Sequence, residues 1–222
     1  MNIIVFTGSG ISQESGIPTF RDTGGTWDNY NVDEVASIEG YKKNPQLVLD
    51  FYNSRRKNLN AVQPNAAHYA LVELEKYHKV TIVTQNVDDL HERAGSTNVI
   101  HLHGQLKKCR DEITNELYDY DTDINVGTLS PNGNQLRPDI VWFGELVMNM
   151  PMVDHLCKSA DCLIIIGSSL AVSPASQIAW YVPDSCDIIV VDKDIPYVHR
   201  EHREYIGNAT EQVPIMVNDL KF

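Results

Sequence analysis

Short, largely apolar runs recur along this chain, and they constrain its fold more than any other feature. They are rich in β-branched residues and too short for helices, so each predicts a buried strand. Strands buried on both faces that alternate with helices form parallel sheets. The sequence therefore predicts an α/β fold in which helices cover both faces of a parallel sheet. The predicted strands are residues 3–6, 80–83, 99–102, 140–143, 163–166 and 188–191, and the predicted helices are 44–58, 64–77, 89–94, 152–160, 175–181 and 211–220.

Composition excludes several classes of protein. With 222 residues, of which 42% are hydrophobic, the chain can bury the core of one compact unit. A net charge of −12 repels a phosphate backbone, and Lys and Arg are not clustered with aromatics, so a nucleic-acid partner is not expected. Four cysteines without a C-x-x-C pair fit reduced thiols. Without a signal peptide or a membrane-length apolar run, we expect a soluble, cytoplasmic protein.

A glycine-containing segment follows the first predicted strand. Gly8 and Gly10 have no side chains, so backbone N–H groups can approach a pyrophosphate closely. The helix expected after them presents its positive end to the same anion. The usual dinucleotide fingerprint has a third glycine where this chain has Gln13, so the match is incomplete. A tight turn without a ligand is the alternative interpretation.

The continuation, Ser15-Gly16-Ile17-Pro18-x-Phe20-Arg21, resembles the opening block of the sirtuins, and most closely that of their short bacterial members. Sirtuins are NAD-dependent protein-lysine deacylases. The block departs from the family pattern only at Ser9, where the family has alanine. Further family motifs follow in order at residues 84–91, 103–104, 143–145 and 167–174. The resemblance covers nearly the whole chain, and it implies a Rossmann-like sheet.

The resemblance also implies an NAD site at the ends of the strands. Asp192 stands where the family usually has asparagine. A carboxylate accepts hydrogen bonds from ribose hydroxyls and repels a 2′-phosphate, which favours NAD over NADP. The implied cofactor-binding residues are Gly8, Ser9, Gly10, Ile11, Ser12, Phe20, Arg21, Gln85, Asn86, Asp88, Gly167, Ser168, Ser169 and Asp192.

By the same resemblance, Asn86, Asp88 and His103 are catalytic, although polar residues at a strand end often form only a turn. His101 points the same way from the predicted strand, so spacing alone does not distinguish it from His103. The family's His-Gly pair selects His103, whose near-neutral pKa suits a general base. In the implied reaction the acyl-lysine oxygen attacks C1′ of the ribose and nicotinamide leaves. His103 then helps to deprotonate a ribose hydroxyl, which attacks the resulting imidate, and water completes the sequence to give free lysine and O-acyl-ADP-ribose.

Tyr52 and Arg55 are the residues in the sequence that indicate which acyl group is removed. They lie three residues apart on a predicted helix and share a face. A solvated arginine beside a core aromatic is the simpler interpretation. Their arrangement resembles that of sirtuins that remove succinyl and malonyl groups, where the pair receives the acyl carboxylate. The implied substrate residues are Tyr52, Arg55, Val141, Phe143, Gly144 and Glu145.

Residues 23–60 and 105–139 lack the strand–helix alternation. The resemblance implies that these insertions form a small lobe beside a large Rossmann-like lobe of residues 1–22, 61–104 and 140–222. Typical sirtuins hold a structural zinc with two Cys-x-x-Cys pairs between the His-Gly and Phe-Gly-Glu motifs. Here that interval contains only Cys109, so a four-thiolate site cannot be built, and we expect no metal.

Two other classes of function are compatible with the same features. A protein ADP-ribosyltransferase or an NAD hydrolase would use the same C1′ chemistry, and a binding module would use NAD without turnover. The set Asn86, Asp88 and His103 disfavours the binding module, while Tyr52 and Arg55 favour deacylation of acylated-lysine proteins or peptides. The sequence does not fix the oligomeric state, and a monomer is compatible with it.

Overall fold

The computed structural model describes residues 1–19 and 30–221. Phe20 and Arg21, which are among the implied cofactor-binding residues, lie outside the described residues.

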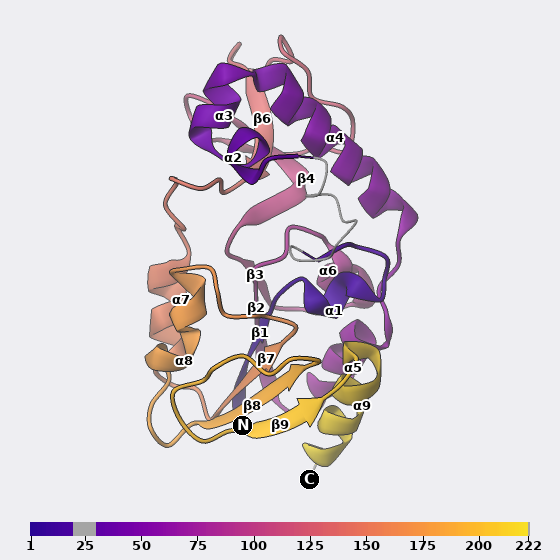
Figure 1. The fold of residues 1–222 in the computed structure, drawn as a ribbon, viewed down its shortest axis with the longest axis vertical. Coiled ribbons are helices and arrows are strands. Elements are labelled where there is room, and N and C mark those ends of the chain that lie inside the picture. The colour runs from indigo at the N-terminus through magenta and orange to yellow at the C-terminus, as the bar shows by residue number, and fades with distance from the viewer. Residues whose placement is uncertain (20–29, 222) are drawn as a thin grey trace.

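Among the described residues, six parallel strands form a sheet in the order β3-β2-β1-β7-β8-β9 (Figure 1). The prediction of a Rossmann-like parallel sheet is confirmed. The edge strand β9 was not predicted, because three of its four residues are exposed and it has no continuous apolar run. The strands are β1 (Asn2–Thr7), β2 (Lys79–Thr84), β3 (Val99–His101), β7 (Cys162–Ile166), β8 (Asp187–Asp192) and β9 (Arg203–Ile206).

Helices cover both faces of this sheet because alternate strand residues point to opposite sides. Ile3 and Val5 pack with α5 (Ala66–Leu74) and α9 (Ala209–Asp219) on one face. Ile4 and Phe6 pack with α7 (Met150–Cys157) and α8 (Ile178–Tyr181) on the other. Full burial of such a side chain contributes about 1.5–3 kcal/mol. The shorter helices are α1 (Gly10–Gln13), α6 (Leu90–Ala94) and the 3₁₀ turn η1 (Ala175–Gln177).

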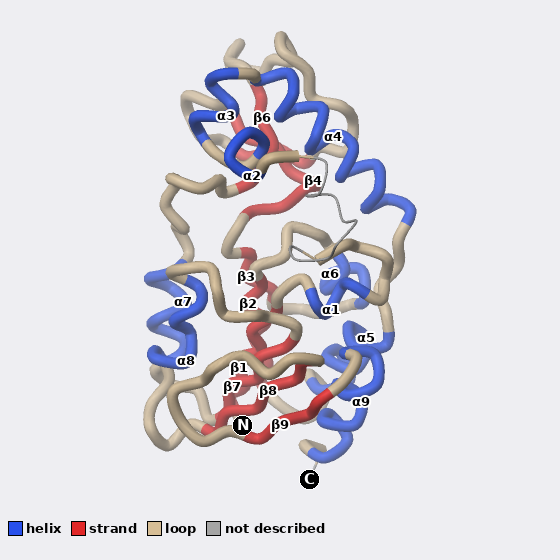
Figure 2. Tube along the Cα trace, in the orientation of Figure 1, coloured by secondary structure: helices blue, strands red, loops and turns tan. Residues whose placement is uncertain are grey.

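A second, antiparallel sheet has the order β5-β4-β6 and lies beyond the ends of the large sheet (Figure 2). Its strands are β4 (Gly104–Asp111), β5 (Leu117–Asp119) and β6 (Leu136–Ile140). The strand predicted at 140–143 was wrong, because β6 ends at Ile140 and pairs with β4. The apolar residues after it instead form a connection, in which Trp142 joins the core beside this sheet.

In the part of the chain that the structure describes, three helices accompany the small sheet, namely α2 (Val32–Val35), α3 (Ile38–Lys43) and α4 (Pro45–Ala61). The predicted start of α4 is confirmed, since the Asn44 side chain accepts a hydrogen bond from Leu47 N at 3.2 Å and Pro45 opens the helix. Neither α2 nor α3 was predicted, since four and six residues are too few to show a helical period.

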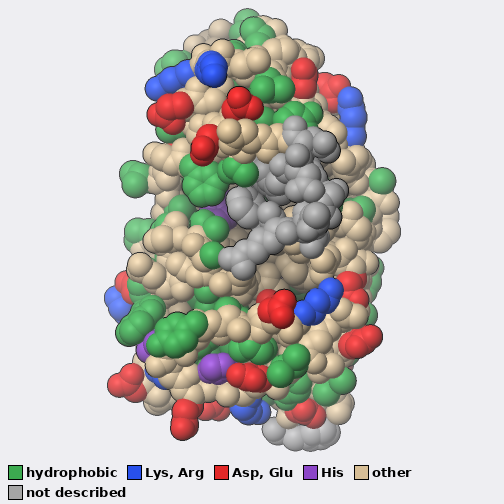
Figure 3. Space-filling model, viewed as in Figure 1, with side chains coloured by type: hydrophobic (Ala, Val, Ile, Leu, Met, Phe, Trp, Pro, Cys, Tyr) green, Lys and Arg blue, Asp and Glu red, His purple; other side chains and the backbone are tan. Residues whose placement is uncertain are grey.

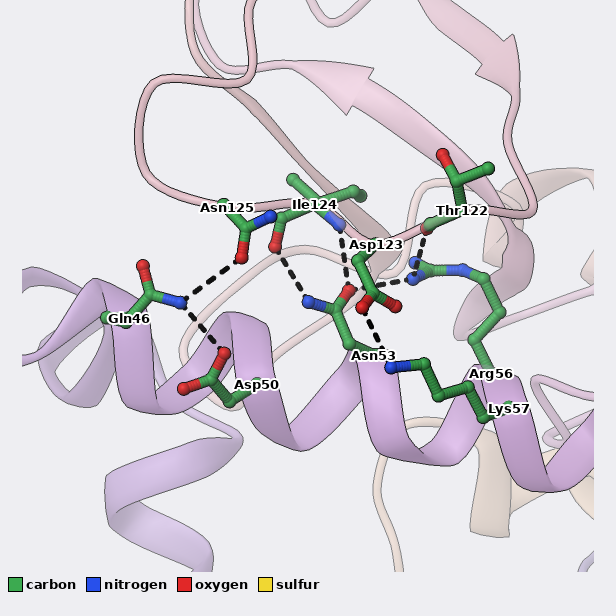
Figure 4. A network of polar contacts seen from close by, with 9 residues as sticks. All are labelled: Gln46, Asp50, Asn53, Arg56, Lys57, Thr122, Asp123, Ile124 and Asn125. Carbon is green, nitrogen blue, oxygen red and sulfur yellow. Dashed lines mark hydrogen bonds and ion pairs between the residues drawn. The ribbon is translucent and has the colours of Figure 1, made fainter.

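One face of α4 is attached to residues 122–125 (Figure 4). The Asn53 amide donates to Ile124 O at 2.8 Å, and its Oδ1 accepts from Ile124 N at 2.9 Å. The buried Arg56 guanidinium donates to Leu106 O at 2.7 Å and to Thr122 O at 3.2 Å. These buried hydrogen bonds fix the rotation of α4 about its own axis.

None of the helices in residues 1–19 and 30–221 has the length and apolar character needed to cross a membrane.

Candidate functional site

A cavity of about 1230 Å³ lies between the two sheets. It opens at the carboxyl ends of β1 and β7, which are neighbours whose following helices lie on opposite faces of the large sheet. Ligands of open α/β sheets bind at such a switch point. On the face shown in Figure 3, hydrophobic side chains gather at the left. Of the predicted residues, Gly8, Ser9, Gly10, Tyr52, Arg55, Gln85, Asn86, Asp88, His103, Val141, Phe143, Gly144, Glu145, Gly167, Ser168, Ser169 and Asp192 line the cavity.

The glycines after β1 and β7 interlock two loops at the cavity wall. A Cβ on Gly8 would lie 2.5 Å from Gly167 O, and one on Gly10 would lie 2.6 Å from Gly167 Cα. The amide of Gly8 donates to Ile166 O at 3.0 Å, and that of Gly10 donates to Gly167 O at 2.9 Å. Close packing of the loops therefore pairs both of these amides with backbone carbonyls.

Other backbone donors remain beside this interlock. Within the described part of the chain, the amides of Ser9, Ser168 and Ser169 have no hydrogen-bond acceptor, and all three residues line the cavity. These donors lie beside glycines, whose backbone a ligand can approach closely. Such a set of donors fits the pyrophosphate of a dinucleotide. Asp192 lines the same cavity, and burial raises its pKa although its Oδ1 accepts from Lys193 N at 2.7 Å.

Ile11 and Ser12, which were predicted to bind the cofactor, do not line the cavity. Ile11 belongs to the core under the sheet. The Ser12 hydroxyl is buried, donates to Asp88 Oδ2 at 3.1 Å and accepts from Asn86 Nδ2 at 3.2 Å. Both residues therefore support the wall from behind, because α1 turns their side chains inward after a single short turn.

The polar residues after β2 are held by the glycine loops. Asn86 Nδ2 donates to Gly8 O at 3.0 Å, so its Oδ1 is left to face a ligand. Gln85 Oε1 accepts from the Ser168 hydroxyl at 2.9 Å, which leaves the Gln85 amide donors for a ligand. Burial raises the pKa of Asp88, and the hydrogen bonds from Leu90 N and Ser12 oppose that rise. A carboxylate in this position favours positive charge developing on a bound group.

The two histidines near the end of β3 differ in their contacts. His103 lines the cavity, and its Nδ1 lies 3.1 Å from Gln85 O. A carbonyl only accepts, which assigns the proton to Nδ1 and leaves the Nε2 lone pair free in the neutral ring. Burial lowers the pKa of His103 against the opposing effect of the Gln85 carbonyl, so the ring is neutral near pH 7. His103 therefore has the state required of a general base.

His101, by contrast, is buried with both ring nitrogens engaged. Its Nδ1 lies 3.0 Å from Asn86 O, and its Nε2 lies 2.7 Å from Glu92 Oε1. Burial lowers the pKa of His101, but the hydrogen bond and charge of Glu92 outweigh burial, and the net change is upward. A ring held between two acceptors positions the Asn86 backbone and has no free nitrogen to accept a proton.

The residues predicted to contact the substrate line the cavity on the side of the small sheet. The Tyr52 hydroxyl accepts from Trp142 Nε1 at 3.1 Å, and burial raises the pKa of Tyr52 to about 12, so it stays protonated. The Arg55 guanidinium carbon lies 5.9 Å from the centroid of the Tyr52 ring. A cationic donor and a phenol donor therefore lie together at one end of the cavity.

The connection after β6 joins the two parts of the site. Val141 N donates to His103 O at 3.0 Å, and Phe143 N donates to Ala36 O at 2.9 Å. Glu145 was predicted to contact substrate, but its carboxylate accepts from Arg137 at 2.5 Å and from Trp142 N at 2.8 Å. Glu145 therefore holds this connection in place. Trp142 and Arg137 were missed, because the pattern around Trp142 predicted an ordinary strand and no local signal pairs Arg137 with it.

The chain matches the model of the Sir2 family over residues 8–174. It is 51% identical over 199 residues to the NAD-dependent protein deacylase of Helicobacter pylori, covering 89% of this chain and 87% of that one. It is also similar to a Sir2 homologue in complex with ADP-ribose, with a TM-score of 0.90, 35% identity and coverage of 99% and 92% of the two chains. A Sir2 homologue in complex with NAD gives a TM-score of 0.89 at 35% identity, covering 99% and 89%. On these matches and this site geometry, the chain belongs to the Sir2 family.

Proposed function

We propose that this protein is an NAD-dependent protein-lysine deacylase that removes succinyl or malonyl groups as well as, or instead of, acetyl. The products would be nicotinamide, free lysine and O-acyl-ADP-ribose. The observation that carries the proposal is one cavity that joins the glycine loops, a neutral His103 and the pair Tyr52 and Arg55. Relatives named NAD-dependent protein deacylase support the general reaction.

When bound, NAD supplies an electrophilic ribose carbon with nicotinamide as its leaving group. The amides of Ser9, Ser168 and Ser169 are the donors suited to its pyrophosphate, and Asn86 Oδ1 is an acceptor for hydroxyl or amide hydrogens. His103 accepts a proton at Nε2, while Gln85 O holds the opposite nitrogen and so fixes the ring. Asp88 favours the charge that develops as the leaving group departs.

Acyl selectivity would come from the opposite end of the cavity. An acyl carboxylate that enters this site loses its hydration and must recover that free energy from protein donors, whereas an acetyl group makes no such demand. The Arg55 guanidinium and the Tyr52 hydroxyl are two such donors on one face of α4. Hydrogen bonds to charged groups contribute about 1.5–3 kcal/mol, which corresponds to ~10- to 100-fold in rate.

The test is Arg55→Met, assayed on matched acetyl-, succinyl- and unmodified peptides with mass detection. We expect kcat/KM for the succinyl peptide to fall on the order of tenfold to a hundredfold more than that for the acetyl peptide. The matched control is Lys57→Met, which removes an exposed cation of the same helix that pairs with Asp123 and does not line the cavity.

Two results would contradict this proposal. Equal losses on both acyl peptides would mean that Arg55 supports the fold or the cofactor instead of the acyl group. Measurable deacetylation without any desuccinylation by the parent protein would remove the proposed acyl selectivity. Transfer of ADP-ribose to the unmodified peptide, visible in the same mass spectra, would instead favour an ADP-ribosyltransferase.

A further inference from the structure

The hydrogen bond between Trp142 and Tyr52 has a fixed direction. An indole N–H can only donate, so at a separation of 3.1 Å the Tyr52 oxygen is the acceptor. The hydroxyl proton of Tyr52 must therefore point to another partner. Within residues 1–19 and 30–221 no acceptor receives it, although the Tyr52 side chain is only 1% exposed. A buried donor without a partner carries a desolvation cost, which an acceptor entering the cavity would remove.

Neighbouring side chains hold the Trp142 ring on several sides. The Arg137 guanidinium carbon lies 4.1 Å from the centroid of the Trp142 ring, and the Tyr41 ring centroid lies 4.8 Å away. Glu145 links these parts, because it accepts from Arg137 and from the Trp142 backbone amide. The indole is buried and held by its neighbours, so the direction of its N–H is set before substrate arrives.

We propose that Trp142 determines acyl specificity by orienting the Tyr52 hydroxyl as a donor toward a carboxylate-bearing acyl group in the cavity. This inference rests on the proposed function and extends it to a residue outside the Tyr-x-x-Arg pair. The Trp142 N–H points at the Tyr52 oxygen, so the Tyr52 hydrogen cannot turn toward the indole and is directed away from it. The acyl carboxylate then faces the hydroxyl hydrogen of Tyr52, and Arg55, three residues later, supplies the positive charge. Burial also keeps Tyr52 protonated at neutral pH.

Trp142→Phe tests this role, because it keeps an aromatic ring and removes the N–H donor. A neutral hydrogen bond contributes about 0.5–1.5 kcal/mol, so the ratio of desuccinylation to deacetylation should fall ~2- to 12-fold. The change should appear mainly in KM. Binding of succinyl and acetyl peptides without NAD, measured by calorimetry, should show the same selective loss. The ratio of the two activities and the ratio of the two binding constants are both independent of the fraction of protein that is folded.

Two further variants make the test specific. In the background of Tyr52→Phe, Trp142→Phe should cause no additional change in the ratio, because the hydroxyl that it orients is gone. The matched control is Trp180→Phe on α8, whose side chain is 66% exposed and does not line the cavity, and it should leave the ratio unchanged.

Each contrary result has its own meaning. Equal losses on both acyl peptides, or a selective loss that persists without the Tyr52 hydroxyl, would overturn the role of Trp142 and leave the proposed deacylase standing. A parent protein that deacetylates but does not desuccinylate would overturn the role of Trp142 together with the proposed acyl selectivity, and would leave the deacylase reaction standing.

Discussion

Low pH should destabilise this protein, because two histidines behind the glycine loops are buried. His68 on α5 and His91 on α6 are 0% and 1% exposed, and their ring centroids lie 5.0 Å apart. Burial lowers the pKa of His68 to about 4. Burial is the largest cause that lowers the pKa of His91 well below its usual range, and the charges of the nearby His68 and His101 lower it further. Within the described chain, His68 Nε2 and His91 Nδ1 have no hydrogen-bond partner, so both rings fold in the neutral form.

The sign and size of the effect follow from linkage. A histidine whose pKa is lower when folded stabilises the protein above its unfolded pKa, near 6.5, and that stabilisation is lost as pH falls toward the folded value. For His68, with a folded pKa of about 4, the loss between pH 7 and pH 5 is about 2 kcal/mol. His101 has the opposite sign, since its raised pKa gives stability that is present below pH 6.5 and lost as pH rises.

His68→Gln isolates this effect. Asn65 N donates to His68 Nδ1 at 3.3 Å in a capping box at the start of α5, and a glutamine at this position can accept the same hydrogen bond. The free energy of unfolding should be measured by urea denaturation at intervals between pH 7 and pH 5. We expect the variant to lose about 2 kcal/mol less than the parent over that range. An unchanged pH dependence would refute the assignment, and the exposed His155→Gln serves as control.

Two further predictions concern catalysis and metal content. His103→Ala should lower deacylation by ~10²–10⁴-fold while calorimetry still detects NAD binding, because proton transfer and not cofactor affinity is its proposed task; near-normal turnover, or an equal loss in His101→Ala, would contradict the assignment. Elemental analysis should find no stoichiometric zinc, because Cys109 is the only cysteine between His103 and Phe143; one tightly held zinc per chain, with unfolding on chelation, would contradict this expectation.

The large sheet was predictable because its central strands are buried on both faces and therefore leave continuous apolar runs in the sequence. The small sheet has no such pattern. Its strand β6 buries Arg137 and Asp139, which pair with Glu145 and Arg110 from elsewhere in the chain. Polar residues that find partners far along the sequence cannot be distinguished from solvated ones by periodicity.

The same limit applied to the site. Motif position placed Gly8, Asn86 and His103 at the cavity, but it did not show which polar atoms the protein itself uses. The structure shows that the side-chain oxygens of Ser12 and Glu145 form hydrogen bonds with neighbouring side chains and with the backbone. Hydrogen-bond satisfaction depends on segments that are distant in sequence, and so it becomes visible only when the fold is known.

Helix α4 shows why this matters for specificity. Arg55 and Arg56 are consecutive, and in a helix they therefore point about 100° apart. Arg55 lines the cavity, while Arg56 is buried and donates to the Leu106 carbonyl. Arg56 also donates to the Thr122 carbonyl (Figure 4). A rotation of α4 that moved Arg55 out of the cavity would leave the Arg56 guanidinium buried without acceptors, which is among the costliest losses in a core. The main chain around the small sheet, which the sequence left without any predicted structure, therefore fixes where Tyr52 and Arg55, the pair proposed to recognise the acyl group, point.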